Sequence, residues 1–174
     1  FHDYHGNAID RGGLRFLPRS MLSAVGLRLF SYRSATPWLG YRAIRHIGSL
    51  LSDDSSVLEY GSGMSTLWFA RRVGRVVSIE TDGRWFSKIR EKLDSARNGH
   101  VTYLLTDIDQ VAHVESVEDS SFDFVLVDGV TRDLVMGVAV RKVKPGGYVY
   151  LDNSDVPYPE FQVARQILIE AAGD

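Results

Sequence analysis

The sequence predicts an α/β fold in which a doubly wound, mainly parallel sheet carries helices on both faces. Two observations support this prediction. Short apolar runs rich in β-branched residues alternate with amphipathic segments, and the alternation occurs five times along the chain. Strands that are apolar throughout must be covered on both faces, and right-handed crossovers between parallel strands then require the doubly wound order.

Five strand–helix pairs are therefore expected. They comprise residues 57–60 with 65–73, 76–80 with 84–96, 101–105 with 109–117, 124–128 with 133–143, and 148–152 with 159–172. A further helix is predicted to start after Thr36, a good N-cap, with Pro37 in its first turn. Residues 1–35 show no sustained periodicity, so we expect an N-terminal arm or lid before a domain spanning 36–174.

The composition narrows the class of protein. The chain has no cysteine, which excludes disulfides, thiolate metal sites and cysteine nucleophiles. No apolar run approaches the ~20 residues that cross a bilayer, and nothing resembles a signal peptide, so we expect a cytoplasmic protein without a membrane partner. Residues 1–50 carry a net charge of +5 and the remainder −7, which leaves contact with an acidic substrate or nucleic acid as an alternative to solvated charge.

A glycine loop follows the first predicted strand. Residues 57–66 are Val-Leu-Glu-Tyr-Gly-Ser-Gly-Met-Ser-Thr, a buried strand, a turn and a helix start. Gly61 and Gly63 allow close backbone approach, and Ser65 or Thr66 could cap the helix. Because ligands of doubly wound sheets bind outside the carboxyl ends of the strands, this loop is a candidate ligand site.

The acidic residues beside this loop indicate which cofactor it would bind. Glu80 ends the second strand, nineteen residues after Gly61, where a carboxylate can accept both ribose hydroxyls. A dinucleotide fingerprint would have glycine at Thr66, and Glu59 would repel a pyrophosphate. S-adenosylmethionine carries a sulfonium cation and no phosphate, so the charge pattern favours it.

These motifs together resemble a known family. Glu-x-Gly-x-Gly (59–63), Glu80, Asp107, Phe-Asp-Phe-Val-Leu-Val-Asp (122–128) and Lys-Pro-Gly-Gly (144–147) are similar to class I S-adenosylmethionine-dependent methyltransferases, which have a Rossmann-like sheet. Asp-Gly-Val-Thr-Arg resembles the small-molecule and sugar O-methyltransferase branch. That family usually ends in an antiparallel β-hairpin, which we do not find after Ala172 and expect to be absent or truncated.

The resemblance implies a cofactor-binding set at the strand ends. Its members are Glu59, Tyr60, Gly61, Ser62, Gly63, Ser65, Glu80, Thr81, Asp107, Ile108 and Asp128. Residues 61–63 would line the methionine moiety, with Glu59 near its amino group. Glu80 would hold the ribose, Asp107 would meet the adenine, and Asp128 would close the site below the methyl group.

Asp128 and Arg132 are the expected catalytic residues, and a divalent metal is an open alternative. Asp128 ends the fourth strand, while Asp152 and Asn153 end the fifth. Their oxygens are hard ligands suited to Mg²⁺, which could acidify an acceptor hydroxyl. The same residues could instead cap helices or contact the cofactor directly. Thr131 stands where the catechol-type branch has lysine, which argues against a catechol acceptor.

The predicted function is transfer of a methyl group from S-adenosylmethionine to a hydroxyl of a small metabolite or sugar, with Mg²⁺ assistance left open. A nucleic-acid methyltransferase is an alternative supported only by the arginine-bearing arm, and we do not expect a nucleic-acid partner. A non-catalytic nucleotide-binding module, either a degenerate methyltransferase or an NAD-binding protein, is the other alternative. The expected partner is a small-molecule acceptor, and a homo-oligomer stays open.

Overall fold

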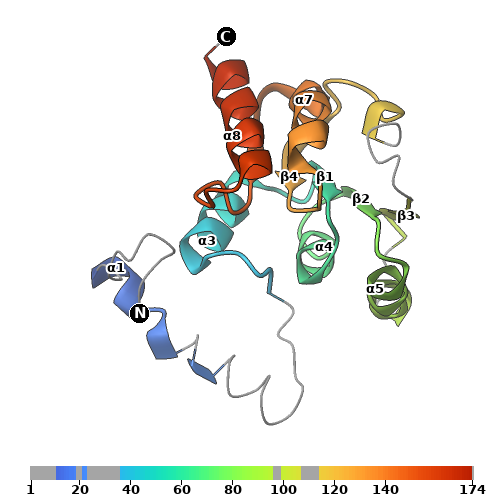
Figure 1. Ribbon diagram of the computed structural model, residues 1–174. Helices are drawn as coiled ribbons and strands as arrows, with labels where there is room; N and C mark the ends of the chain where they lie inside the picture. Colours follow the sequence, from blue (N-terminus) through green and yellow to red (C-terminus); the bar gives the residue numbers. More distant parts are fainter. Residues whose placement is uncertain (1–10, 19–20, 23–35, 96–98, 107–113, 174) are drawn as a thin grey trace.

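The computed structural model describes residues 11–18, 21–22, 36–95, 99–106 and 114–173 (Figure 1). Its sheet has five strands in the order β3-β2-β1-β4-β5, and every adjacent pair is parallel. The strands are β1 (Ser56–Tyr60), β2 (Arg75–Glu80), β3 (Val101–Leu105), β4 (Phe122–Val127) and β5 (Val143–Leu151). The doubly wound sheet predicted from the sequence is confirmed.

Helices cover both faces of this sheet, with α7 and α8 on one side and α3, α4 and α5 on the other (Figure 1). They are α1 (Arg11–Leu14), α3 (Tyr41–Leu50), α4 (Met64–Phe69), α5 (Gly83–Ser95), α7 (Arg132–Lys142) and α8 (Pro159–Ala172). Neighbouring residues of one strand face opposite cores: Leu58 packs with α7, whereas Val57 packs with α3 and α4. This explains why the strands are apolar throughout.

The chain order creates a switch point at β1. From β1 the chain moves outward through β2 and β3, and then returns to the other side of β1 as β4. Tyr60 pairs with Ile79 of β2 and with Val127 of β4, so the ends of these three strands are level. Loops leaving β1 and β4 run to opposite faces, which opens a crevice between them.

The start of α3 differs from the prediction. The helix begins at Tyr41, its N-cap is Gly40, and the first helical bond runs from Ile44 N to Gly40 O (3.0 Å). Thr36 and Pro37 therefore precede the helix, and the prediction that they start it was wrong. The reason lies in packing, because Leu39 is buried against the core beneath α3 and holds the segment before it in a non-helical path.

The start of β5 also differs from the prediction. β5 begins at Val143, so the Lys-Pro-Gly-Gly segment lies inside the strand rather than before it. A Cβ at Gly147 would lie 2.8 Å from the carbonyl oxygen of Asp123 in β4, so glycine allows this close pairing. The helix expected at 109–117 falls largely outside the described residues, whereas α8 has the predicted bounds.

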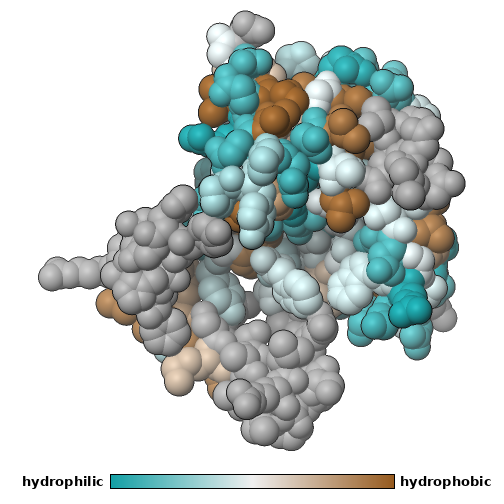
Figure 2. Space-filling model, in the orientation of Figure 1, coloured by the Kyte–Doolittle hydropathy of each residue, from teal (hydrophilic) through white to brown (hydrophobic). Residues whose placement is uncertain are grey.

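The surface over α7 and α8 mixes hydrophilic with hydrophobic residues (Figure 2). Exposed apolar side chains on these helices include Leu134 and Ile169. In the segment predicted as an arm, Phe16 stacks on Tyr41 of α3 with 5.5 Å between ring centroids, and the division into arm and domain stays a prediction. None of the helices in the described part of the chain has the length and apolar character needed to span a membrane.

Candidate active site

A cavity of about 390 Å³ opens at the carboxyl ends of β1, β2 and β4. It is lined by Gly61, Ser62, Glu80, Thr81, Asp82, Asp128, Gly129, Val130, Thr131, Arg132, Glu160 and Phe161. Half of these residues belong to the predicted site, and each of them lies at the end of a strand or in the segment that follows it. The structure thus gathers residues from 61 to 132 of the chain around one space, as the sequence analysis expected.

Two glycines allow the loops after β1 and β4 to touch. Gly61 has φ +90°, and a Cβ there would lie 2.4 Å from the backbone nitrogen of Gly129. A Cβ on Gly129 would in turn lie 2.5 Å from the ring of Tyr60. The buried Tyr60 side chain therefore supports the loop rather than lining the cavity. Gly129 was not among the predicted site residues, although an Asp-Gly pair directly after a buried strand was an available signal.

Glu80 lies beside the glycine turn, as its spacing predicted. Its Oε2 accepts hydrogen bonds from the Ser62 backbone N–H (3.1 Å) and the Ser62 hydroxyl (2.5 Å). Its Oε1 accepts from the N–H groups of Thr81 (2.7 Å) and Asp82 (2.9 Å). These bonds hold the carboxylate at the cavity wall, where it is 7% exposed. A charge-assisted network of this kind fixes the carboxylate's orientation.

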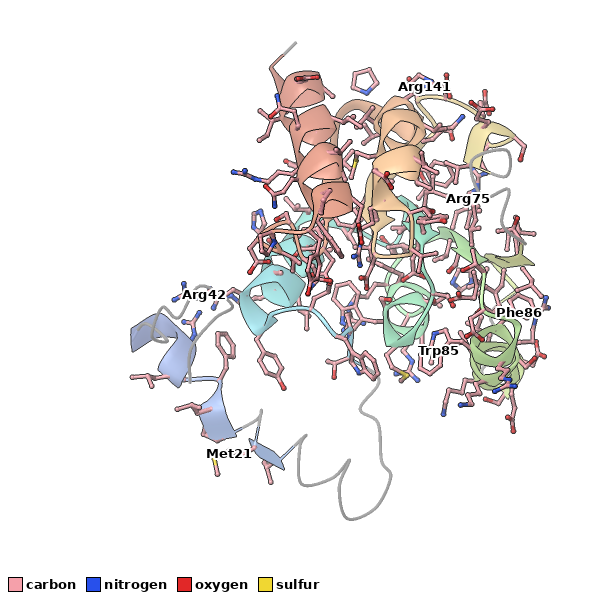
Figure 3. The ribbon with its side chains drawn as sticks, in the orientation of Figure 1. Met21, Arg42, Arg75, Trp85, Phe86 and Arg141 are labelled. Atoms are coloured by element: carbon pink, nitrogen blue, oxygen red, sulfur yellow. The ribbon has the colours of Figure 1, made fainter. Side chains whose placement is uncertain are left out.

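Two aromatic residues support the same loop. The Ser62 hydroxyl lies 2.7 Å from the Tyr103 hydroxyl, and Trp85 Nε1 donates to the Ser62 carbonyl at 2.7 Å. Figure 3 shows Trp85 between α5 and α4. Burial raises the pKa of Tyr103, so this phenol stays protonated at neutral pH and can donate to Ser62. Tyr103 was missed because its β3 position gives no sign that it reaches the loop after β1.

Glu59 lies behind the loop and does not line the cavity. It is fully buried, and its Oε2 accepts from the hydroxyls of Thr66 (2.5 Å) and Ser78 (2.6 Å). Burial raises the pKa of Glu59 to about 7, although hydrogen bonds from Ser65, Ser78 and Thr66 oppose the shift. Its Oε1 has no hydrogen-bond partner within the described part of the chain. One buried acceptor therefore remains available beneath the glycine loop.

The start of α4 corrects the predicted cap. The N-cap is Gly63 rather than Ser65 or Thr66, which both lie inside the helix. Thr66 Oγ1 accepts the backbone N–H of Gly63 at 3.0 Å and also donates to Glu59. Thr66, the third residue of the helix, therefore accepts a hydrogen bond at the helix start and links that start to the buried carboxyl group of Glu59.

Arg132 and Asp128 line another part of the cavity. Arg132 Nη2 donates to Asp128 Oδ1 (2.7 Å), to the Asp128 carbonyl (3.0 Å) and to Asn153 Oδ1 (3.4 Å). The guanidinium carbon lies 4.6 Å from the ring centroid of Phe161. The residue is 7% exposed, and its Nε has no hydrogen-bond partner among the residues described. This cation is consequently fixed in position.

The two aspartates interact directly. Burial raises the pKa of both Asp128 and Asp152, and the charge of Asp152 raises that of Asp128 further, whereas Arg132 opposes both shifts. Together these effects raise the pKa of Asp128 to about 6, so its carboxyl group takes up a proton more readily than an exposed aspartate does.

The residues proposed as Mg²⁺ ligands do not fit a metal ion. Asp128, Asp152 and Asn153 are brought together as expected, but Arg132 occupies the space beside two of them. A fixed positive charge 4 Å away would repel the ion by about 4 kcal/mol for each unit of the metal's charge at an effective dielectric constant of 20. Across the described ranges, no cluster of three or more His, Cys, Asp or Glu side chains could hold a metal.

Some expected site residues are not tested by the structure. Asp107 and Ile108, which would meet the adenine, lie outside the described residues. Glu160 and Phe161 line the cavity from α8 and were missed. The sequence offered no motif for these two, because only the packing of α8 beside α7 brings them to the strand ends.

Comparison with known proteins agrees with this geometry. Residues 58–151, more than half of the chain, match the family model of a methyltransferase domain. With its parallel sheet and cavity at the switch point, the chain belongs to the class I S-adenosylmethionine-dependent methyltransferases, for which S-adenosylmethionine is the expected cofactor. No curated protein matches the chain.

Solved structures show the same fold. A proposed caffeoyl-CoA O-methyltransferase from Staphylococcus aureus is 17% identical with a TM-score of 0.62, and 94% of this chain and 88% of that one are covered. A precorrin 8w decarboxylase from Methanobacterium thermoautotrophicum is 20% identical with a TM-score of 0.61 (80% and 75% covered). A precorrin-6y C5,15-methyltransferase from Geobacter metallireducens is 18% identical with a TM-score of 0.58 (78% and 74% covered). The chain spans half of another match, the YcgJ protein from Bacillus subtilis.

Proposed function

We propose that this chain transfers a methyl group from S-adenosylmethionine to a hydroxyl group of a small molecule. The observation that carries the proposal is the joint position of two features on one cavity. The Gly61 turn with Glu80 forms one part of its wall, and Asp128 with Arg132 forms another. The groups that would bind the cofactor and accept the proton thus line the same cavity.

The residues present fit the cofactor. Glu80 would accept hydrogen bonds from ribose hydroxyls, and the side-chain-free backbone at Gly61 allows close approach of the methionine portion. The cavity wall contains four carboxyl groups against one guanidinium, a balance that favours a sulfonium cation over a pyrophosphate. Bound S-adenosylmethionine supplies an electrophilic methyl group on a sulfur that leaves readily.

This chain's own residues would prepare the acceptor. A hydroxyl group must give up its proton as its oxygen forms a bond to carbon, and Asp128, which lines the cavity and whose pKa burial raises, would receive that proton. Arg132 would stabilise the negative charge that develops on the oxygen, because it is a fixed cation at the cavity wall. The rest of the catalytic effect would come from positioning the two reactants.

Calorimetric titration tests the proposal most directly. We expect saturable binding of S-adenosylhomocysteine and no binding of NAD under the same conditions. The opposite result would remove the methyltransferase proposal in favour of a dinucleotide-binding module. Following isotope-labelled methyl groups from S-adenosylmethionine into a panel of hydroxylated compounds would then identify the acceptor.

Glu80→Ala tests the cofactor half of the site. We expect the affinity for S-adenosylhomocysteine to fall by roughly 1–3 kcal/mol, the cost of losing a charge-assisted hydrogen bond. Glu91→Gln is the matched control, because Glu91 is an exposed acidic residue on α5. Unchanged affinity in the folded Glu80→Ala variant would contradict the ribose role.

A further inference from the structure

We propose that Arg132 is the built-in cation of this active site and takes the position that a divalent metal would occupy between the ends of β4 and β5. The acceptor oxygen would then meet a guanidinium group instead of a metal ion. This inference deepens the proposed function and depends on it for the identity of the reaction. Whether Arg132 excludes a metal ion can be tested separately.

Arg132 contacts oxygens that a metal ion in this position would need as ligands. A single nitrogen, Nη2, lies 2.7 Å from Asp128 Oδ1 and 3.4 Å from Asn153 Oδ1. These oxygens belong to two of the three residues that the strand ends offer as hard ligands. A cation that enters this space must displace the arginine or share oxygens with it.

Several contacts hold the guanidinium there. Arg132 is the first residue of α7, so its backbone is fixed by the helix, and its side chain is 9% exposed. The ring of Phe161 lies 4.6 Å from the guanidinium carbon, within the range of a cation–π contact. The Asp128 carbonyl accepts a further bond from Nη2 at 3.0 Å. The arginine is therefore held from α7, α8 and the end of β4.

Arg132 also keeps hydrogen-bonding capacity. It lines the cavity, and its buried Nε has no partner in the described part of the chain. A buried donor without a partner is unfavourable, and a ligand oxygen at this position would satisfy it. The contacts of Nη2 with Asp128 and Asn153 therefore do not exhaust the hydrogen-bonding capacity of Arg132.

Binding of Mn²⁺, followed by electron paramagnetic resonance and calorimetry, tests the inference without an assay of activity. We expect no stoichiometric binding to the wild-type protein or to Arg132→Lys, which keeps a positive charge. Arg132→Met removes the charge and leaves the oxygens, so it should bind Mn²⁺ at least about tenfold more tightly than the wild type, a tenfold change being about 1.4 kcal/mol. Adding Asp152→Asn to Arg132→Met should abolish the gain.

Arg165→Met is the matched control, since it removes an exposed arginine from α8 without touching the carboxyl pair. Tight Mn²⁺ binding to the wild-type protein would overturn the inference. So would an Arg132→Met variant that unfolds cooperatively on heating and gains no Mn²⁺ binding. Binding of S-adenosylhomocysteine, measured in the same samples, separates the two proposals. If the wild-type protein does not bind S-adenosylhomocysteine, the proposed function is contradicted. The Mn²⁺ measurement then still decides the role of Arg132.

Discussion

At the residue scale, two glycines set the distance between the loops after β1 and β4. Gly61 combines a left-handed φ of +90° with a backbone contact that leaves no room for a Cβ. Most glycines in the chain lack one of these two features. Gly137, within α7, has open space where a Cβ would be. Gly61 therefore has no room for a side chain, whereas Gly137 has room for one.

We expect Gly61→Ala to lower the free energy of unfolding by at least about 2 kcal/mol, because the new methyl group meets the backbone of Gly129 and the φ angle is unfavourable for alanine. Gly137→Ala should instead raise it by about 0.5–1 kcal/mol, since alanine restricts the unfolded chain and suits a helix. Urea unfolding of both variants checks the signs. Equal effects would contradict the close contact of the two loops.

Glu59 should make stability depend on pH. Its folded pKa of about 7 lies above its ordinary value of 4.5, so between these values the folded chain keeps a proton that the unfolded chain releases. The free energy of unfolding should therefore fall as pH rises through this window and level off above it. The contribution of Glu59 to this fall is about 3 kcal/mol at most, at 1.36 kcal/mol per pKa unit.

Glu59→Gln isolates this contribution, because glutamine cannot ionise. Urea unfolding of the wild type and the variant at pH 5 and pH 8 gives the measurement. The wild type should lose more stability than the variant over this interval. Identical slopes would mean that Glu59 is ionised in the folded protein throughout the range.

The residue scale also shows what spacing could reveal. The distance in sequence from Gly61 to Glu80 predicted that Glu80 lies beside the glycine turn, where it accepts a hydrogen bond from Ser62, because a strand–helix–strand unit returns the chain to the same sheet edge. The same reasoning placed Glu59 near the ligand. The structure instead turns its side chain toward Ser78 and Thr66, since its position in β1 faces the core. Strand ends are predictable, but which side of the loop a side chain takes is decided by packing.

At the scale of elements, α8 was predicted with its observed bounds, but its role was not. Its buried Ala164 packs in the core shared with α7, and this contact brings Glu160 and Phe161 over the cavity. Amphipathic periodicity identifies a helix and its apolar face, yet it does not say which neighbour that face meets. The contribution of α8 to the site is therefore a property of the packed structure.

A larger side chain at Ala164 should displace this helix. We expect Ala164→Leu to lower the free energy of unfolding by about 1–3 kcal/mol, because the residue has no exposed surface and the core has no room. Val163→Leu, one position away and about half exposed, should change it little. Equal effects in a denaturant titration would contradict the packing of α8 on α7.

At the scale of the whole molecule, the sheet order connects the glycine turn and the carboxyl pair through adjacent strands. β1 lies between β2 and β4, so one ligand can contact the ends of all three. A ligand that binds only when these ends are assembled must stabilise the fold as a unit. Its effect should therefore appear in global unfolding and not only in local changes.

S-adenosylhomocysteine at 100 times its dissociation constant should raise the free energy of unfolding by about 2.7 kcal/mol. Thermal and urea unfolding with and without the ligand would measure this effect. In Glu80→Ala at the same ligand concentration the stabilisation should be smaller. Equal stabilisation by NAD at matched concentration would contradict the proposed cofactor.

The sequence by itself determined the doubly wound parallel sheet, the alternation of strands and helices along the chain, and the strand ends beside which Gly61, Glu80, Asp128 and Arg132 lie, because alternating patterns and right-handed crossovers leave few arrangements. Only the tertiary structure decided the start of α3, the support of Ser62 by Tyr103, and the placement of a guanidinium where a metal ion was an open alternative. Each of these depends on side chains from distant segments competing for the same space, and sequence spacing carries no information about which one occupies it.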